Sequence, residues 1–320
     1  MSSAVTTIRA ARKPSVVVIG NFDGVHRGHQ AVLRQARALA DERGLRCMVL
    51  TFDPHPSEVL GRGSPPRLTS LARRVALLRV HGADDVAVEP FTMELASWSP
   101  ERFAHELLVK RLTARVVVVG TNFRFGHQRA GDFETLRLLG EDAKSTRGKN
   151  SATFEALSAE VAGDEEGPFS STRVRDAVGT GDVERAAGVL GRPHALTGIV
   201  EHGDARGRTL GFPTANLGGV VEMLPAHGVY AVRVAITDGA GSSGTLEGTR
   251  GVMNVGMRPT VAGVSLRIEA HLFDFEGDLY GAQLRVDLVA RLRGEQKFSG
   301  LSELREQIAR DAEAARKALS

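Results

Sequence analysis

The chain has 320 residues, a length that favours two domains over one. Its composition, 42% hydrophobic and 25% charged, is that of an ordinary globular protein. A net charge of only +3, with no block of Lys or Arg, argues against a nucleic-acid-binding protein. Cys47 is the single cysteine, so no disulfide can form within the chain and a cytoplasmic location is expected. No apolar stretch approaches the roughly 20 residues of a membrane helix, and we expect no membrane association.

The first half of the chain alternates between strand and helix patterns. Apolar runs predict strands at 15–20, 46–52, 84–89 and 115–120. Helical spacing of apolar residues predicts helices at about 29–43, 69–82, 99–112 and 132–140. Runs such as VVVIG and RVVVVG are typical of strands that are covered on both faces. The alternation therefore predicts a parallel, Rossmann-like α/β domain whose ligand site lies at the carboxyl edge of its strands.

The middle of the chain is less regular. Residues 141–151 are almost entirely polar and predict a surface loop, and a weak strand is expected at 152–159. Two short helices follow, separated at Gly179–Gly181. The composition changes near residues 188–193, so we expect one domain over residues 1–187 and a second over 188–320.

The second domain shows strand periodicity from about Leu196 onward, with short strands between glycine-rich turns. This pattern predicts a small antiparallel β-barrel. Two sets of alternating residues are each expected to face one way: Leu266, Ile268, Ala270 and Leu272, and then Leu284, Val286, Leu288, Ala290 and Leu292. A C-terminal helix is expected to bury the stripe Leu301, Leu304, Ile308, Ala315 and Leu319.

The segment GNFDGVHRGH follows the first strand and opens the first helix. Its candidate ligand-binding residues are Gly20, Asn21, Phe22, Asp23, His26, Gly28 and His29. Helix-start amides and the helix dipole favour phosphate, glycines allow close approach, and two histidines supply further donors. A metal site would need at least one more ligand. Two plain surface histidines are the remaining alternative.

Candidate residues also follow other strands of the first domain. Pro54, His55 and Pro56 form a stiff loop after the second strand, which is equally compatible with a rigid turn. After the fourth strand, Asn122 and Arg124 could reach phosphate or base, and Phe123 could pack on a planar ring. Ser171, Thr172 and Arg175 lie at a later helix start and suit a triphosphate, although a plain N-cap explains them without any ligand.

In the second domain, a non-periodic loop concentrates glycine and oxygen-bearing side chains. Its candidate residues are Gly207, Thr209, Gly211, Pro213, Thr214 and Asn216. Oxygen ligands of this kind suit Mg²⁺ and phosphates. Glu269 lies in a predicted strand on the face opposite the apolar residues, and periodicity alone favours a solvated glutamate there.

Taken in order, these motifs resemble the bifunctional bacterial riboflavin kinase/FMN adenylyltransferase family, the FAD synthetases of prokaryotes. The matching blocks run from Val16 to the last helix: GNFDGVHRGH, TFDPHP, VGTNFRFG, SSTRVR, GRTLGFPTANL, GVYAV, RPTV, HLFDFEGDLYG and LRGEQKF. The resemblance implies an α/β nucleotidylyltransferase domain followed by a six-stranded kinase barrel. The implied reactions are ATP-dependent phosphorylation of riboflavin to FMN and adenylyl transfer from ATP to FMN, giving FAD.

The resemblance also implies roles for individual residues. His26 and His29 would stabilise phosphates during adenylyl transfer, with Ser171, Thr172 and Arg175 as further ATP ligands. The nucleotide site would include Gly20, Asn21, Phe22, Asp23, Gly28, Asn122 and Arg124, and the flavin would contact Pro54, His55, Pro56 and Phe123. In the barrel, Thr214 and Asn216 would hold Mg²⁺ and ATP, and Glu269 would be the catalytic base.

Two other functions stay open at this point. One is a riboflavin kinase whose nucleotidylyltransferase domain is inactive or uses a different acceptor. The other is a flavin-binding module without catalysis. Incubation with riboflavin, ATP and Mg²⁺ would separate the three, because they predict different products.

Overall fold

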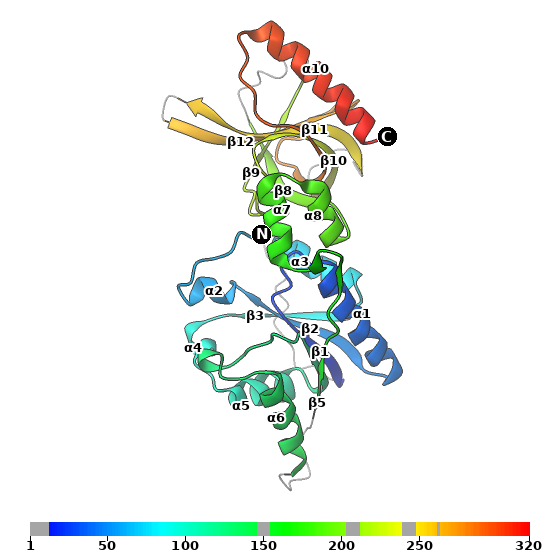
Figure 1. Ribbon diagram of the computed structural model, residues 1–320, viewed down its shortest axis with the longest axis vertical. Helices are drawn as coiled ribbons and strands as arrows, with labels where there is room; N and C mark the ends of the chain where they lie inside the picture. The colour runs from blue at the N-terminus through cyan, green and yellow to red at the C-terminus, as the bar shows by residue number, and fades with distance from the viewer. Residues whose placement is uncertain (1–12, 146–153, 203–211, 239–247, 261–262) are drawn as a thin grey trace. The chain divides into compact units, whose positions relative to one another are not determined.

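The computed structural model describes residues 13–145, 154–202, 212–238, 248–260 and 263–320 (Figure 1). The chain divides into two compact units. The first comprises residues 1–65 and 71–169, and the second residues 66–70 and 170–320. The expected division into residues 1–187 and 188–320 stays a prediction.

The first unit is built on a five-stranded parallel sheet in the order β3-β2-β1-β4-β5. Its strands are β1 (Ser15–Ile19), β2 (Arg46–Asp53), β3 (Asp85–Pro90), β4 (Ala114–Val119) and β5 (Glu155–Ser158). The predicted parallel, Rossmann-like sheet is thus confirmed. A separate pair of short strands, β6 (Gly163–Asp164) and β7 (Gly167–Pro168), lies outside it.

Helices cover both faces of this sheet (Figure 1). They are α1 (Arg27–Glu42), α2 (Pro56–Val59), α3 (Leu71–Val80), α4 (Met93–Ala96), α5 (Pro100–Phe103), the π-helix η1 (Ala104–Arg111), the 3-10 turn η2 (His127–Arg129) and α6 (Phe133–Ser145). Alternate residues of each buried strand enter different cores. In β1, Val17 packs with residues of η1 and α6, whereas Val16 packs with residues of α1 and α3. The continuous apolar runs are explained by this two-sided burial.

Two expectations for the first unit were wrong in detail. The single helix expected at 99–112 is a short α-helix, α5, that continues as the π-helix η1. The loop expected from residue 141 begins later, because α6 runs to Ser145. Its half-buried Arg137 is bonded to Glu134 and Glu141, and such pairs support a polar helix end. Residues 146–151 of that expected loop lie outside the described residues.

The second unit is a closed six-stranded antiparallel barrel in the order β10-β11-β12-β9-β8-β13. The strands are β8 (His194–Glu201), β9 (Ala215–Gly218), β10 (Gly228–Asp238), β11 (Thr249–Thr260), β12 (Gly263–Leu272) and β13 (Gln283–Arg293). Two helices, α7 (Ser171–Thr180) and α8 (Val183–Leu190), precede the barrel, and α10 (Leu301–Ala318) follows it. The barrel and the C-terminal helix are as predicted.

The barrel has an apolar interior and an outer face that α10 partly covers. Ile268, Ala270 and Leu272 of β12 belong to the interior cluster. On the outer face, Phe273 packs with Ala315 and Leu319 from the C-terminal helix. The side chains between the interior positions of a strand, such as Glu269 and His271, therefore lie on the outer face.

Four apolar positions differ from expectation. Register shifts between β10 and β13 place Ala290 and Leu292 with the outer cluster under α10, although Leu288 faces the interior. The alternation expected through residue 292 thus breaks at this bulge. Leu266 and Leu301 are exposed, because each lies near one end of its element, beyond the packed region.

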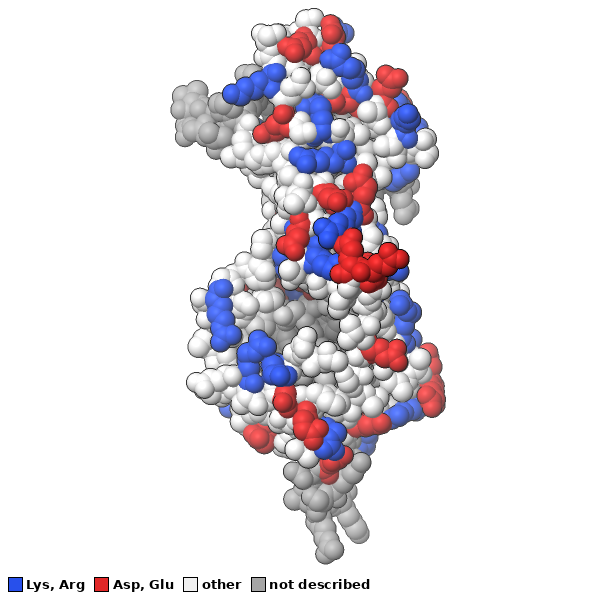
Figure 2. All heavy atoms as spheres, viewed as in Figure 1, with Lys and Arg blue, Asp and Glu red and all other residues white. Residues whose placement is uncertain are grey.

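No helix among the described residues is long and apolar enough to span a membrane. On the face shown in Figure 2, acidic and basic side chains are interspersed rather than gathered into one basic stripe.

Candidate functional site

The strand order places a switch point at β1, because its neighbours β2 and β4 lie on opposite sides of it. In open parallel sheets, ligands bind beyond the carboxyl ends of the strands at such a point. Asn21 follows β1, Pro54 follows β2 and Asn122 follows β4. The predicted residues after these strands are thus brought to one edge of the sheet.

The loop after β1 has an unusual backbone that fits a ligand-binding turn. Phe22 and Val25 have positive φ angles of 52° and 41°, and Gly24 between them has 84°. Positive φ is costly for residues with a Cβ and is tolerated where surrounding structure enforces it. Both apolar side chains are buried, which anchors the loop. A Cβ on Gly28 would lie 3.0 Å from the His26 ring, so glycine leaves room for that ring.

His26 and His29 form a stacked pair at the start of α1. Their ring centroids are 3.6 Å apart with planes 26° from parallel, and the Phe22 ring contacts His29 edge-on at 5.1 Å. His26 is the N-cap of α1, and its Nδ1 accepts a hydrogen bond from the His29 backbone N–H at 3.4 Å. Nδ1 of His26 is therefore unprotonated in this arrangement, which leaves Nε2 as its donor. His26 is buried and His29 is half-buried.

Arg74 joins the loops after β1 and β2, and the sequence analysis missed it. Its Nη1 donates to the Asn21 carbonyl oxygen at 2.9 Å, and its Nη2 is 3.1 Å from Asp53 Oδ1. The Asn21 carbonyl also accepts from the Thr51 hydroxyl at 3.1 Å. One signal was available, because Arg74 lies on the stripe that Leu71 and Leu78 define on the predicted helix. A charge on an apolar stripe calls for a buried partner.

The loop after β2 contacts the loop after β1 directly. His55 Nε2 lies 2.9 Å from the Asn21 side-chain amide nitrogen, and His55 is also the N-cap of α2, with Pro56 as the first helical residue. The interpretation as a rigid turn and the interpretation as a ligand-facing loop are therefore compatible. Pro54, His55 and Pro56 are all half-buried.

The residues after β4 are less closely integrated. Asn122 and Arg124 are exposed, and Arg124 Nη1 donates to the neighbouring Phe123 carbonyl at 2.9 Å. Phe123 stacks on the buried Phe125 at 5.3 Å and packs against the core. Their roles in binding stay predictions.

Ser171, Thr172 and Arg175 lie in α7, which belongs to the second unit. Ser170 is the N-cap of α7, and its hydroxyl accepts from the Arg173 N–H at 3.2 Å. Ser171 and Thr172 therefore stand in the first helical turn, next to amides that a helix leaves unbonded. Arg175 Nε donates to the Pro66 carbonyl at 2.8 Å.

In the barrel, one row of polar residues crosses neighbouring strands. Glu269 of β12 is paired with Asn216 of β9 on one side and with Asn254 of β11 on the other. Directly opposite residues in antiparallel strands place their side chains on the same face. This face is the outer one, and Asn254 on it is exposed. The loop interpretation of residue 216 was wrong, because β9 already begins at Ala215.

Asn216 provides the test of whether a cation fits here. Its Oδ1 is buried and has no hydrogen-bond partner among the described residues. A buried amide oxygen without a partner is costly, and a hard cation would satisfy it. The described residues contain no group of three His, Cys, Asp or Glu side chains that could hold a metal. A site made of hydroxyl and amide oxygens, with water completing the shell, fits Mg²⁺. Gly207, Thr209 and Gly211 lie outside the described residues.

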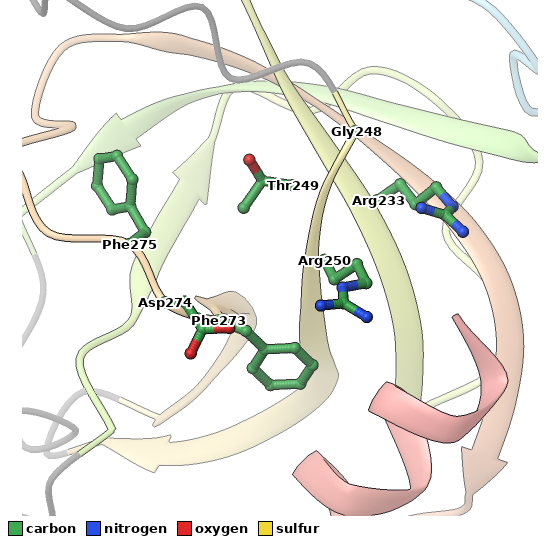
Figure 3. Close-up of a pocket in the computed structure, with 7 residues that line it drawn as sticks. All are labelled: Arg233, Gly248, Thr249, Arg250, Phe273, Asp274 and Phe275. Atoms are coloured by element: carbon green, nitrogen blue, oxygen red, sulfur yellow. The ribbon is translucent and has the colours of Figure 1, made fainter. Parts of the chain in front are cut away.

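A hollow of about 350 Å³ is lined by Arg233 of β10, by residues 248–250 around the start of β11 and by residues 273–275 after β12. Figure 3 shows Phe275 on one side of it and the guanidinium groups of Arg233 and Arg250 on the other. Asp274 also lines the hollow, and both terminal nitrogens of Arg316 donate hydrogen bonds to its carboxylate at 2.9 and 3.0 Å. These hydrogen bonds lower the pKa of Asp274. None of these residues was predicted from the sequence.

A parallel α/β unit with a candidate phosphate site at its switch point, together with a barrel that carries a carboxylate on its outer face, is typical of a two-domain nucleotide-using transferase. Comparison with known proteins gives the family. Residues 8–160 match the family model for FAD synthetase, and residues 190–319 match the one for riboflavin kinase.

Named relatives cover nearly the whole chain. The bifunctional riboflavin kinase/FMN adenylyltransferase of Escherichia coli (strain K12) is 40% identical over 309 residues, which are 96% of this chain and 94% of that protein. The protein of the same name from Bacillus subtilis (strain 168) is 37% identical over 314 residues, 96% and 93% of the two chains.

A solved structure from Streptococcus pneumoniae, described as a macrolide-efflux protein, shares the fold at 32% identity and a TM-score of 0.82. The similarity covers 98% of this chain and 96% of that one.

The chain belongs to the bifunctional riboflavin kinase/FMN adenylyltransferase family. It is an enzyme of flavin cofactor synthesis that carries a FAD synthetase domain and a riboflavin kinase domain, and riboflavin, FMN and ATP are its substrates.

Proposed function

We propose that the switch-point residues of the first unit carry adenylyl transfer from ATP to FMN, and that the polar row on the barrel carries phosphorylation of riboflavin. The observation that supports the first assignment is the stacked His26–His29 pair at a helix start. For the second assignment, it is the pairing of Glu269 with Asn216.

Adenylyl transfer needs no protein nucleophile, because the FMN phosphate is already anionic near neutral pH. The reaction needs alignment and stabilisation of the charge that develops on the α-phosphate and on leaving pyrophosphate. His26 has Nε2 as its donor, and the first amides of α1 point toward the same region. Ser171, Thr172 and Arg175 are proposed as additional ATP ligands. Asn122, Phe123 and Arg124 are proposed to contact nucleotide and flavin.

Riboflavin phosphorylation makes a different demand, because the ribityl hydroxyl is a poor nucleophile. A carboxylate that orients this hydroxyl and accepts its proton increases the rate. Glu269 is half-buried on the outer face and is proposed as that base. Thr214 and Asn216 are proposed to hold Mg²⁺ and ATP beside it. When bound, Mg²⁺ neutralises charge on the transferring phosphates. Gly207, Thr209, Gly211 and Pro213 are proposed to shape the same nucleotide site.

One incubation tests both assignments. The protein is incubated with riboflavin, ATP and Mg²⁺, and the flavins are separated by chromatography. FMN followed by FAD is expected. Accumulation of FMN alone would favour a kinase with an inactive or differently specific first domain. Absence of both products would favour a non-catalytic flavin-binding module.

We also propose that the protein works in the cytoplasm. Cys47 is the only cysteine, so the fold needs no oxidising compartment. Cell fractionation with antibody detection tests this, and recovery with the membrane or the exported fraction would contradict it.

A further inference from the structure

His271 lies two residues beyond Glu269 on the same strand and has no role in the assignments above. Its Nδ1 donates a hydrogen bond to the Pro213 carbonyl oxygen, and the two atoms are 2.8 Å apart. Pro213 immediately precedes Thr214 in the chain. The contact therefore joins the strand of the candidate base to the segment that carries the candidate Mg²⁺ and ATP ligands.

The backbone pairing of this segment with β12 is short. The pairing of β9 with β12 consists of Asn216 with Glu269 and Ala215 with Ala270. Pro213 has no backbone N–H, so it cannot donate a further hydrogen bond to the backbone of β12. His271 supplies the next attachment along β12, and its ring also meets the Phe212 ring edge-on at 5.5 Å. Phe212 and Pro213, the residues just before Thr214, thus both contact this imidazole.

The imidazole is itself held in place from its other side. The Phe273 ring contacts it edge-on, with centroids 5.8 Å apart. Arg316 of α10 lies over Phe273 at 4.3 Å and binds Asp274, which Figure 3 shows next to Phe273. A side chain fixed in this way loses little further freedom when it bonds Pro213, so the bond can define the position of the backbone.

We propose that His271 is a positioning residue of the riboflavin kinase reaction: it holds the Phe212–Thr214 backbone so that Thr214 and Asn216 face the nucleotide beside Glu269. The inference rests on the proposed role of Thr214 and Asn216. His271 acts through these residues and takes no proton in the reaction.

The test compares His271→Ala with His271→Asn in the full-length protein. Asparagine keeps an N–H donor close to the position of Nδ1, whereas alanine removes it. FMN plus FAD formed from riboflavin is measured against ATP concentration at saturating Mg²⁺ and riboflavin. FAD formed from supplied FMN reports on the other unit of the same chain. His105→Asn, an exposed histidine of η1 in the first unit, is the matched control.

His271→Ala is expected to raise the KM for ATP in the kinase reaction about tenfold, the effect of one lost hydrogen bond, with a smaller change in kcat. His271→Asn is expected to recover most of that loss, and FAD formation from FMN is expected to be unchanged in both variants. An unchanged KM in the alanine variant would overturn the inference. So would an asparagine variant as impaired as the alanine one, or an equal loss of both activities.

Asn216→Ala separates the inference from the assignment beneath it. If Asn216→Ala raises the KM for ATP and His271→Ala does not, the site assignment stands and the role of His271 is wrong. If neither substitution changes the KM for ATP, both the assignment of Asn216 and the role of His271 are wrong.

Discussion

Glu269 and Asn216 are direct partners across two antiparallel strands of the barrel, and both side chains lie on its outer face. This pairing brings the Glu269 carboxylate next to Asn216 Oδ1, an amide oxygen that lacks a hydrogen-bond partner among the described residues. The strand pairing of the barrel therefore fixes the separation between the proposed base and the proposed cation ligand.

Glu269→Ala is expected to lower FMN formation by about 10²–10⁴, the usual cost of removing a general base. FAD formation from supplied FMN is expected to stay nearly intact, because that reaction uses other residues. Chromatography of both reactions checks this, with Glu306→Ala on the exposed side of α10 as control. Equal loss of the two activities would contradict separate sites.

His29→Ala is expected to do the reverse. It removes a donor from the proposed phosphate site and should lower FAD formation by about 10²–10³ while FMN formation continues. The hydrogen bond by which His26 caps α1 is retained in this variant, because its donor is the backbone N–H of residue 29. His105→Ala serves as control, and unchanged FAD formation in His29→Ala would exclude the proposed role.

Arg74→Met is expected to impair FAD formation although Arg74 is not proposed to touch ATP or FMN. The buried guanidinium holds the Asn21 carbonyl and Asp53, and losing a hydrogen bond to a charged group costs about 1.5–3 kcal/mol. Urea unfolding together with both assays checks this. FMN formation should be retained, and wild-type stability with wild-type FAD formation would show that the contact is dispensable.

Removal of Mg²⁺ with EDTA is expected to stop FMN formation, and added Mg²⁺ should restore it. Asn216→Ala is expected to raise the Mg²⁺ concentration needed for half-maximal rate about tenfold, since it removes one oxygen ligand. A Mg²⁺ titration of the kinase reaction provides the measurement. An unaltered Mg²⁺ requirement would rule out Asn216 as a ligand.

Cys47 is expected to be unreactive in the native protein. Burial raises the pKa of its thiol to about 11, so at pH 8 only about 0.1% would be thiolate, the form that attacks disulfide reagents. Reaction with Ellman's reagent should be at least about 100-fold slower in buffer than in denaturant. Rapid labelling of the folded protein would mean that the strand opens.

Local patterns were sufficient to predict much of the fold. VVVIG and RVVVVG predicted β1 and β4 because two-sided burial leaves an unbroken apolar run. Alternation predicted the interior of β13 up to Leu288 and failed beyond it, because the bulge depends on pairing with β10. A bulge between strands far apart in sequence leaves no local signature.

The site was predictable as motifs rather than as geometry. GNFDGVHRGH predicted a phosphate site at a helix start, but the stacking of His26 on His29 depends on side-chain conformations. The pairing of Glu269 with Asn216 depends on the register between strands more than 40 residues apart in the chain. The partners of Arg74 and His271 were not predictable for the same reason, since each partner lies in a distant segment.

Closure of the barrel also bears on how the protein resists aggregation. A closed sheet leaves less strand edge with free amides and carbonyls than an open one, although among the described residues β12 pairs with β9 only at Glu269 and Ala270. The parallel sheet of the first unit has two edge strands, β3 and β5. The first ends in Pro90, which lacks an amide hydrogen, and the second is four residues long and begins with Glu155, bound to Arg43. Both edge strands are thus poor partners for an incoming strand.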